Sequence, residues 1–215
     1  MDKKPAPKRK YDSSRRQAQA QETRRQIAAA ARRLFLELGY HGTTLDAIAQ
    51  AAAVATETVY AIFGSKRKIL WYLIDTAIGG DEEPVPLMDR EEPQAVLHDT
   101  HPARQIHMFS RGITGILARA APIMEVTRSA ARTDHEIAGL QERMLAERKE
   151  NMARFAQALA GNHGLREGVD EDKAGVLVWT LTSPEVFLLL TRDRDYSAEQ
   201  YAAWLEDTLS RLLLP

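Results

Sequence analysis

The sequence predicts an all-α protein, in which a small three-helix domain at the N-terminus is joined by a fourth helix to a larger helical domain. Apolar residues recur at three- and four-residue intervals along most of the 215 residues, which is the period of an amphipathic helix. Ser, Thr or Asp precedes many of these segments and Gly follows several, as expected at helix ends. Charge divides the chain in the same way. Residues 1–70 have a net charge of +8 and residues 71–215 a net charge of −9. This division favours a basic N-terminal part that binds phosphates and an acidic remainder.

Residues 43–63 predict a short helix, a tight turn and a second short helix. Thr44 is the expected N-cap of the first helix, Val54 the apolar residue of the turn, and Thr56 a candidate cap of the second helix. The second helix is expected to bury Val59, Ile62 and Phe63 and to expose Ala55, Thr56, Glu57, Thr58, Tyr60 and Ala61. Two readings fit this pattern. It is either a helix-turn-helix whose second helix enters a DNA major groove, or a helical corner with polar residues on its solvent face.

Helices are expected on both sides of this stretch. The first is predicted from about Gln19 to Leu38, ending at Gly39, with a buried stripe of Ile27, Ala30, Ala31, Leu34, Phe35 and Leu38. Ser65 is predicted to cap a fourth helix over residues 66–80. That helix begins with three cations, Lys66, Arg67 and Lys68, where the helix dipole disfavours positive charge. A bound phosphate explains this placement, and so does a tolerated exposed cluster.

Residues 1–18 are basic, contain proline and are expected to form a disordered arm. The arm either follows DNA phosphates or a minor groove, or it only improves solubility. Residues 81–101 are predicted to be an irregular connector with at most a short helical turn. The His98-Asp99-Thr100-His101 run does not follow the usual metal-ligand spacing, so no metal site is predicted. Further helices are expected over 102–119, 122–131, 134–161, 170–191 and 197–213.

Residues 22–72 resemble the N-terminal DNA-binding domain of the TetR/AcrR family of bacterial transcriptional regulators. The matching features, in order, are Phe35 with Gly39-Tyr40, Thr43-Thr44, Ile48-Ala49, Val54, Thr58-Val59-Tyr60, Phe63 and Ser65-Lys66. The resemblance implies that Thr44, Tyr60 and Lys66 contact phosphates and that Ala55, Thr56, Glu57 and Thr58 face base edges. It implies a DNA-binding domain at 19–65, a regulatory domain at 66–215, and a homodimer formed through residues 170–213.

Two positions depart from the family pattern. Glu57 places a carboxylate on the reading face, where it either accepts from a cytosine amino group or is repelled by the DNA backbone. Ala61 lacks the polar side chain often found after the tyrosine position, so one common contact is expected to be missing.

A small-molecule pocket is predicted in the larger domain from polar and adaptable apolar side chains. The candidate lining residues are His107, Phe109, Arg111, Met124, Met144 and Trp179. Ordinary core packing is the alternative for each methionine and aromatic residue. Arg111, if buried, needs an anion, either an internal acid or a ligand carboxylate.

The sequence disfavours an enzyme, because we find no phosphate-binding loop, nucleophile elbow or zinc motif, and no cysteine. No cofactor is predicted. No apolar run reaches membrane-spanning length, so we expect a soluble cytoplasmic protein. The prediction is a ligand-responsive transcriptional regulator, most simply a repressor, that binds a pseudo-palindromic operator as a dimer. The alternative is an architectural DNA-binding protein without small-molecule control.

Overall fold

The structure is a computed structural model that describes residues 11–215, and all regular secondary structure in this range is helical, with no strand. Contacts between Cα atoms divide the chain into two compact units. We call Met1–Leu70 the N-terminal unit and Trp71–Pro215 the C-terminal unit. Residues 1–10, which hold most of the predicted basic arm, lie outside the described residues.

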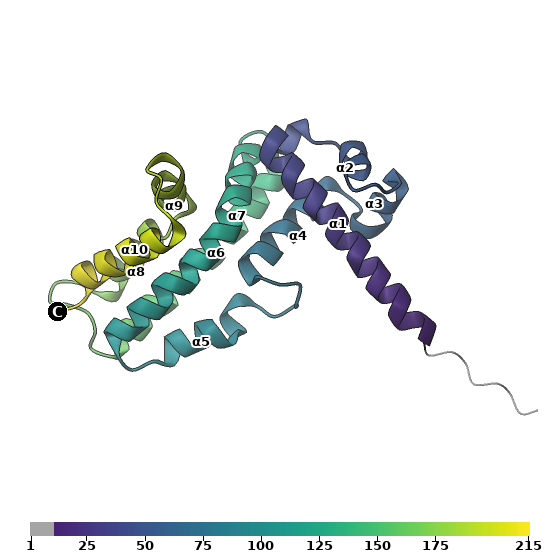
Figure 1. The fold of residues 1–215 in the computed structure, drawn as a ribbon. Helices are drawn as coiled ribbons and strands as arrows, with labels where there is room; N and C mark the ends of the chain where they lie inside the picture. Colours follow the sequence, from purple (N-terminus) through teal and green to yellow (C-terminus); the bar gives the residue numbers. More distant parts are fainter. Residues whose placement is uncertain (1–10) are drawn as a thin grey trace, which may run out of the picture. The chain divides into compact units, whose positions relative to one another are not determined.

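The N-terminal unit contains three helices and the start of a fourth. These are α1 (Tyr11–Gly42), α2 (Leu45–Ala51), α3 (Thr56–Phe63) and α4 (Lys66–Gly79), whose first residues belong to this unit (Figure 1). Helix α1 begins eight residues before the predicted start, so the expectation of disorder is wrong for residues 11–18. Residues 17–33 are rich in Gln, Ala and Arg, and these strong helix formers favour the extension of α1 toward the N-terminus.

Gly39 marks the end of the regular part of α1, as predicted. Its φ angle of 72° kinks the chain before a last short turn that runs to Gly42. This left-handed conformation is open to glycine at no steric cost. Leu38, just before the kink, was expected to be buried but is 55% exposed.

The core of the N-terminal unit is small and contains two aromatic residues in contact. The ring centroids of Phe35 and Tyr40 lie 5.7 Å apart. The other large side chains of this core are Ile27, Ile48, Val59, Phe63, Ile69 and Leu70, all buried. Isolated helices as short as α2 and α3 are marginal in water, so this shared core holds them in place.

The C-terminal unit contains the rest of α4 and the remaining helices. These are the 3₁₀ helix η1 (Leu87–Asp89), α5 (Glu91–His98), α6 (Pro102–Ala131), α7 (His135–Gly161), α8 (Glu171–Leu181), α9 (Pro184–Leu188), the π-helical turn η2 (Leu189–Asp193) and α10 (Ala198–Leu213). Helix α6 packs against α7, α9 and α10, and α7 packs against α8 (Figure 1). The connector is more helical than predicted, since it holds both η1 and α5.

Several helices in this unit begin after a Ser or Asp that caps them, in line with the Ser, Thr and Asp residues that precede many of the predicted segments. The Asp134 carboxylate accepts from the backbone N–H groups of Glu136 and Ile137 at 3.0 and 3.2 Å. Asp170 and Ser183 cap α8 and α9 in the same way. Ser197 forms a full capping box with Gln200 at the start of α10. Each cap satisfies backbone donors that the first helical turn leaves without a partner.

Pro122 does not end a helix, contrary to the prediction of separate helices at 102–119 and 122–131. Helix α6 runs through it without interruption. A proline inside a helix removes one hydrogen bond and crowds the preceding turn. Here the flanking Ala120, Ala121 and Ile123 are all fully buried, and we infer that their packing offsets that local cost.

The core of the C-terminal unit joins α6, α7, α8 and α10. Phe155 stacks on Phe109 with ring centroids 3.9 Å apart, and Tyr201 meets Phe187 edge to face. The Tyr201 hydroxyl donates to the Leu181 carbonyl at 2.9 Å, which satisfies the polar end of a buried ring.

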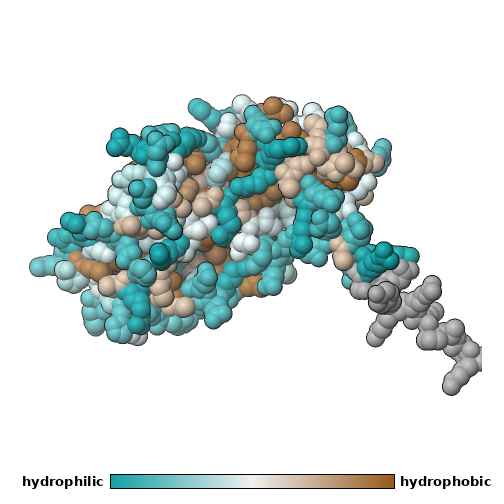
Figure 2. Space-filling model, viewed as in Figure 1, coloured by the Kyte–Doolittle hydropathy of each residue, from teal (hydrophilic) through white to brown (hydrophobic). Residues whose placement is uncertain are grey.

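Hydrophilic residues cover most of the face shown in Figure 2, with smaller hydrophobic patches between them. No single helix within residues 11–215 is long and apolar enough to cross a membrane. The segments Glu171–Leu181 and Pro184–Asp193 reach that length and hydropathy only when counted together, across a bend of 42°.

Candidate functional site

Helices α2 and α3 form a helix-turn-helix held by backbone hydrogen bonds across the turn. The N–H of Ala53 donates to the Gln50 carbonyl at 3.1 Å, and that of Val54 donates to the Ala49 carbonyl at 3.0 Å. Ala53 has a φ angle of 54°, which is unusual for a residue with a side chain. Thr44 caps α2 as predicted, since its hydroxyl oxygen accepts from the Ala47 N–H at 3.0 Å.

Thr56 does not cap α3, contrary to the prediction. The N-cap is Ala55, whose side chain makes no capping bond. Thr56 is the first helical residue, and its hydroxyl donates to the Asp46 carboxylate at 2.9 Å. This bond ties the start of α3 to the first turn of α2. It leaves the Thr56 oxygen able to accept a hydrogen bond, because a hydroxyl has one proton and two lone pairs.

The outer face of α3 carries most of the residues expected to meet DNA. Tyr60 is 54% exposed, and Ala55, Glu57 and Ala61 are also exposed, whereas Thr58 is half-buried. The Glu57 side chain forms no hydrogen bond or ion pair with residues 15–215. The helix therefore presents a phenol and a carboxylate on a surface anchored from below by Val59 and Phe63.

Lys66 lies at the start of α4, but its ammonium group points back to the end of α1. It donates to the carbonyls of Tyr40 and Thr43, both at 2.7 Å, and lies 4.3 Å from the centroid of the Tyr40 ring. A lysine near unsatisfied carbonyls at a helix end is favourable. This internal role accounts for a cation at the start of α4 without a bound phosphate.

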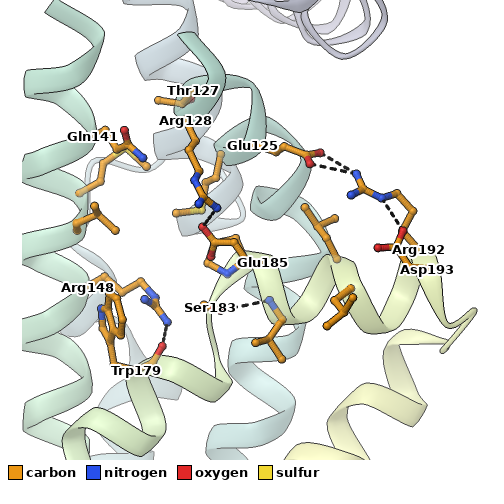
Figure 3. Close-up of a pocket in the computed structure, with 17 residues that line it drawn as sticks. Glu125, Thr127, Arg128, Gln141, Arg148, Trp179, Ser183, Glu185, Arg192 and Asp193 are labelled. Atoms are coloured by element: carbon orange, nitrogen blue, oxygen red, sulfur yellow. Dashed lines mark hydrogen bonds and ion pairs between the residues drawn. The ribbon is translucent and has the colours of Figure 1, made fainter. Parts of the chain in front are cut away.

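The C-terminal unit contains a cavity of about 550 Å³ between α6, α7 and the α8–η2 segment (Figure 3). Its lining includes Met124, Glu125, Thr127 and Arg128 from α6, and Gln141, Met144, Leu145 and Arg148 from α7. Trp179, Ser183, Pro184, Glu185, Val186, Leu188, Leu189, Arg192 and Asp193 complete it. The α7 residues follow a spacing of three and four, so one face of that helix forms a wall. The volume is within the range of small-molecule sites.

Three of the six predicted pocket residues line this cavity: Met124, Met144 and Trp179. The other three do not. His107 Nδ1 lies 2.9 Å from a carboxylate oxygen of Glu206, and Phe109 is stacked on Phe155 in the core. Arg111 is exposed to solvent, so it does not need the buried anion that the sequence reasoning considered.

Arg148 is among the lining residues that the sequence did not predict, and it carries the most distinctive contacts. Its Nη2 donates to the Trp179 carbonyl and to the Thr182 hydroxyl, and its guanidinium lies 4.9 Å from the Trp179 ring centroid. Burial lowers the pKa of Arg148 to about 10, although the charge of Glu185 acts in the opposite direction. Arg148 lies four residues after Met144, on the apolar stripe of α7, and this position was the sequence feature that could have predicted its burial.

No three His, Cys, Asp or Glu side chains within residues 11–215 are grouped to hold a metal ion. In the His98–His101 run, His98 Nδ1 lies 2.8 Å from the Gln94 carbonyl. Asp99 accepts from Arg104 and from the His101 backbone N–H. The hydrogen bond from Arg104 lowers the pKa of Asp99. These groups serve the start of α6.

The fold and these sites define a helical protein with an N-terminal helix-turn-helix and a second unit with a ligand-sized cavity. Residues 27–72 match the family model described as "Bacterial regulatory proteins, tetR family". A curated relative, the HTH-type transcriptional regulator HbdR of Aromatoleum sp. (strain CIB), is 39% identical over 66 residues. That alignment covers 31% of this chain and 29% of HbdR, so the chain spans under a third of the length of this relative.

Solved structures extend the likeness in fold to both units. The repressor NalD from Pseudomonas aeruginosa aligns with a TM-score of 0.69 at 21% identity, over 92% of this chain and 98% of that one. A SmeT–triclosan complex aligns with a TM-score of 0.71 at 18% identity, over 90% and 92%. Together with the match of residues 27–72, these findings confirm the predicted family and fold. Residues 27–72 therefore carry the N-terminal domain of the TetR family.

Proposed function

We propose that this protein is a sequence-specific, DNA-binding transcriptional regulator that acts as a repressor and responds to a small molecule. The observation that carries the proposal is the outer face of α3, which holds an exposed tyrosine and an exposed glutamate on a helix of helix-turn-helix geometry. In such motifs the second helix enters the major groove. Acting on chromosomal DNA, it would work in the cytoplasm, at the nucleoid.

The proposed contacts follow from where each side chain lies. Tyr60 and Thr44 contact phosphates, since both are exposed and Thr44 retains a hydroxyl proton for donation. Ala55, Thr56, Glu57 and Thr58 face bases. Thr56, whose proton is used by Asp46, acts there as an acceptor. Lys66 supports these contacts by holding the α1–α2 junction, and a direct phosphate contact remains the expectation from the family resemblance.

A homodimer is part of the proposal, because two recognition helices about 34–36 Å apart match half-sites one DNA turn apart. Exposed apolar side chains support an interface through residues 170–213. Val176 on α8 is 64% exposed and Leu212 on α10 is 37% exposed. Such side chains are costly to leave in water.

Effector control is proposed from the cavity, and the SmeT relative was solved in complex with triclosan. A ligand that binds better to a state unsuited to DNA would lower DNA affinity, and DNA would weaken ligand binding by the same factor. Architectural DNA binding without such control is the second candidate. It is favoured only by the positive charge of residues 1–70.

Selection of binding sites from random duplex DNA at two salt concentrations tests the proposal. We expect an enriched inverted repeat that is still bound at the higher salt concentration. Binding that is uniform across sequences and lost with salt would reject sequence-specific regulation and leave the architectural candidate, because phosphate contacts alone release counterions and carry no sequence information.

Two variants separate the proposed roles on the outer face of α3. Tyr60→Phe should weaken binding about 10- to 100-fold for all sequences alike, since a hydrogen bond to a charged group is lost. Glu57→Gln should change the preferred sequence. The matched control is Glu37→Gln, which removes the same charge from an exposed position of α1. A changed sequence preference in Tyr60→Phe, or an unchanged one in Glu57→Gln, would contradict these assignments.

A further inference from the structure

The charged residues around the cavity are not paired evenly. Arg192 takes two acids, with Nη1 3.2 and 2.9 Å from the two Glu125 carboxylate oxygens and Nε 3.2 Å from Asp193. Arg128 pairs with Glu185 (Figure 3). Two arginines therefore engage all three carboxylates of the lining. The third arginine, Arg148, forms no ion pair with residues 15–215 and has only neutral hydrogen-bond partners.

The donors of Arg148 are only partly used. Both of its hydrogen bonds start from Nη2, whereas a guanidinium has five N–H groups. The three on Nε and Nη1 have no acceptor among residues 15–215. These nitrogens are not fully buried. Within the described residues, the fully buried side-chain nitrogen or oxygen that lacks a hydrogen-bond partner is Ser110 Oγ, and neither Nε nor Nη1 of Arg148 is in that state. These donors therefore remain accessible beside the cavity.

The position of Arg148 is fixed rather than adaptable. The Trp179 ring lies against one side of the guanidinium, and Thr182, which is fully buried, donates onward to the Val178 carbonyl at 2.7 Å. A partly desolvated cation held in this way gains free energy from an anion, since no carboxylate forms an ion pair with it and the charge of Glu185 only partly offsets its lost hydration. Its lowered pKa still leaves it protonated at neutral pH.

Part of the remaining lining is apolar and adaptable. Met124, Met144, Leu145, Val186 and Leu188 line the space next to the arginine. Methionine and leucine side chains accommodate varied apolar shapes. We propose that the cavity binds a small amphipathic carboxylate, whose anionic group meets Arg148 and whose apolar body fills the space between α6, α7 and α9. This inference rests on the proposed function, because it names the effector class of that regulator.

Calorimetric titration of the full chain without DNA tests the inference with matched pairs of ligands. The probes are decanoate against 1-decanol, and 2-naphthoate against 2-naphthamide. We expect each carboxylate to bind about 10- to 100-fold more tightly than its neutral partner, as charge-assisted hydrogen bonds allow. Arg148→Gln should remove this preference and leave the neutral ligands little changed. Arg143→Gln, at an exposed position of the same helix, should have no effect.

A second readout locates the site. The chain has three tryptophans, so the indole ¹⁵N resonance of Trp179, assigned with Trp179→Phe, should move with decanoate more than those of Trp71 and Trp204. Equal affinity for carboxylates and neutral partners would overturn the inference, as would a carboxylate preference that survives Arg148→Gln. If a second copy of the chain covers the cavity instead of a ligand, carboxylates and neutral partners should bind equally, and this result would also overturn the inference.

Failure of the inference and failure of the proposed function are distinguishable. Sequence-specific DNA binding without a carboxylate preference rejects the effector class alone. A carboxylate preference that depends on Arg148, in a protein that selects no DNA sequence, rejects the regulator alone. If both hold, decanoate or 2-naphthoate should lower operator affinity in the wild type and not in Arg148→Gln.

Discussion

Lys66 in the N-terminal unit and Arg148 in the C-terminal unit are held in similar ways. Each donates to two neutral oxygens, and each lies within 5 Å of the centroid of an aromatic ring. They differ in what surrounds them. Lys66 joins two backbone segments, whereas Arg148 borders a cavity. A cation with neutral partners therefore has a structural role where its N–H groups join two backbone segments, as in Lys66. It is a candidate ligand-binding residue where some of its N–H groups border a cavity, as in Arg148.

The largest effect on stability should come from Lys66→Met. The variant leaves the carbonyls of Tyr40 and Thr43 without their charged donor, which we expect to cost about 2–4 kcal/mol of the local unfolding free energy. Hydrogen exchange of the peptides that cover α2 and α3 measures this, because all three tryptophans lie in the other unit.

Lys68→Met is the matched control for this prediction. Lys68 is exposed, and its ammonium group makes no hydrogen bond with residues 15–215, so the change should be about 0.5 kcal/mol or less. If Lys66→Met left exchange in α2 and α3 unchanged but weakened DNA binding, Lys66 would act as the phosphate contact that the family resemblance implies. The distinction between the two cations would then fail.

Arg148→Met should have a smaller effect on stability, within about 1 kcal/mol of the wild type. Replacing a desolvated charge with an apolar side chain of similar length is often close to neutral, and Thr182 keeps its bond to the Val178 carbonyl. Urea denaturation followed by tryptophan fluorescence reports on this unit. A loss of 3 kcal/mol or more, the cost typical of breaking a buried charge pair, would show that Arg148 is a structural cation like Lys66.

The sequence was a better guide to the helix-turn-helix than to the cavity, and the reason is physical. Caps such as Thr44 and Asp134, and the glycine at position 39, act through the backbone within four residues. They can therefore be read locally. The cavity depends on which faces of α6, α7 and α9 meet, although these helices are distant along the chain. Met124, Met144 and Trp179 were found from residue type alone, and the partners of the arginines were not.

Arginine burial illustrates this limit. Both Arg111 and Arg148 lie on long amphipathic helices beside apolar residues, and the sequence reasoning chose Arg111. The structure exposes Arg111 and places Arg148 against Trp179. Nothing within a few residues of either arginine encodes the ring that packs on only one of them. The same holds for the Asp46–Thr56 bond, which joins residues ten apart across a turn.

Arg90 sharpens the comparison, because it is a third cation and its partner is a carboxylate. It donates to both oxygens of Asp81, at 2.7 and 2.9 Å. The hydrogen bond from Arg90, aided by the backbone N–H of Glu83, lowers the pKa of Asp81 from its ordinary 3.8 to about 2. Asp81 is exposed and Arg90 is half-buried, so water screens the pair and its contribution is expected to be the smallest of the three.

The pH dependence has a defined sign. Because the pKa of Asp81 is lower in the folded state, its contribution is complete above about pH 4 and is lost as the pH falls toward 2. Asp81→Asn should therefore lower the melting temperature slightly at pH 6, and the difference from the wild type should shrink as the pH falls to 2. Asp89→Asn, in the same connector, removes a carboxylate that forms no ion pair with residues 15–215. Its melting temperature should therefore not approach that of the wild type as the pH falls.

The oxygens that hold Lys66 and Arg148 do not titrate in this range, so Lys66→Met and Arg148→Met should shift the melting temperature equally at both pH values. A difference from the wild type for Asp81→Asn that is as large at pH 2 as at pH 6 would show that Asp81 acts independently of its charge, for example through the hydrogen bond that it accepts from the Glu83 N–H.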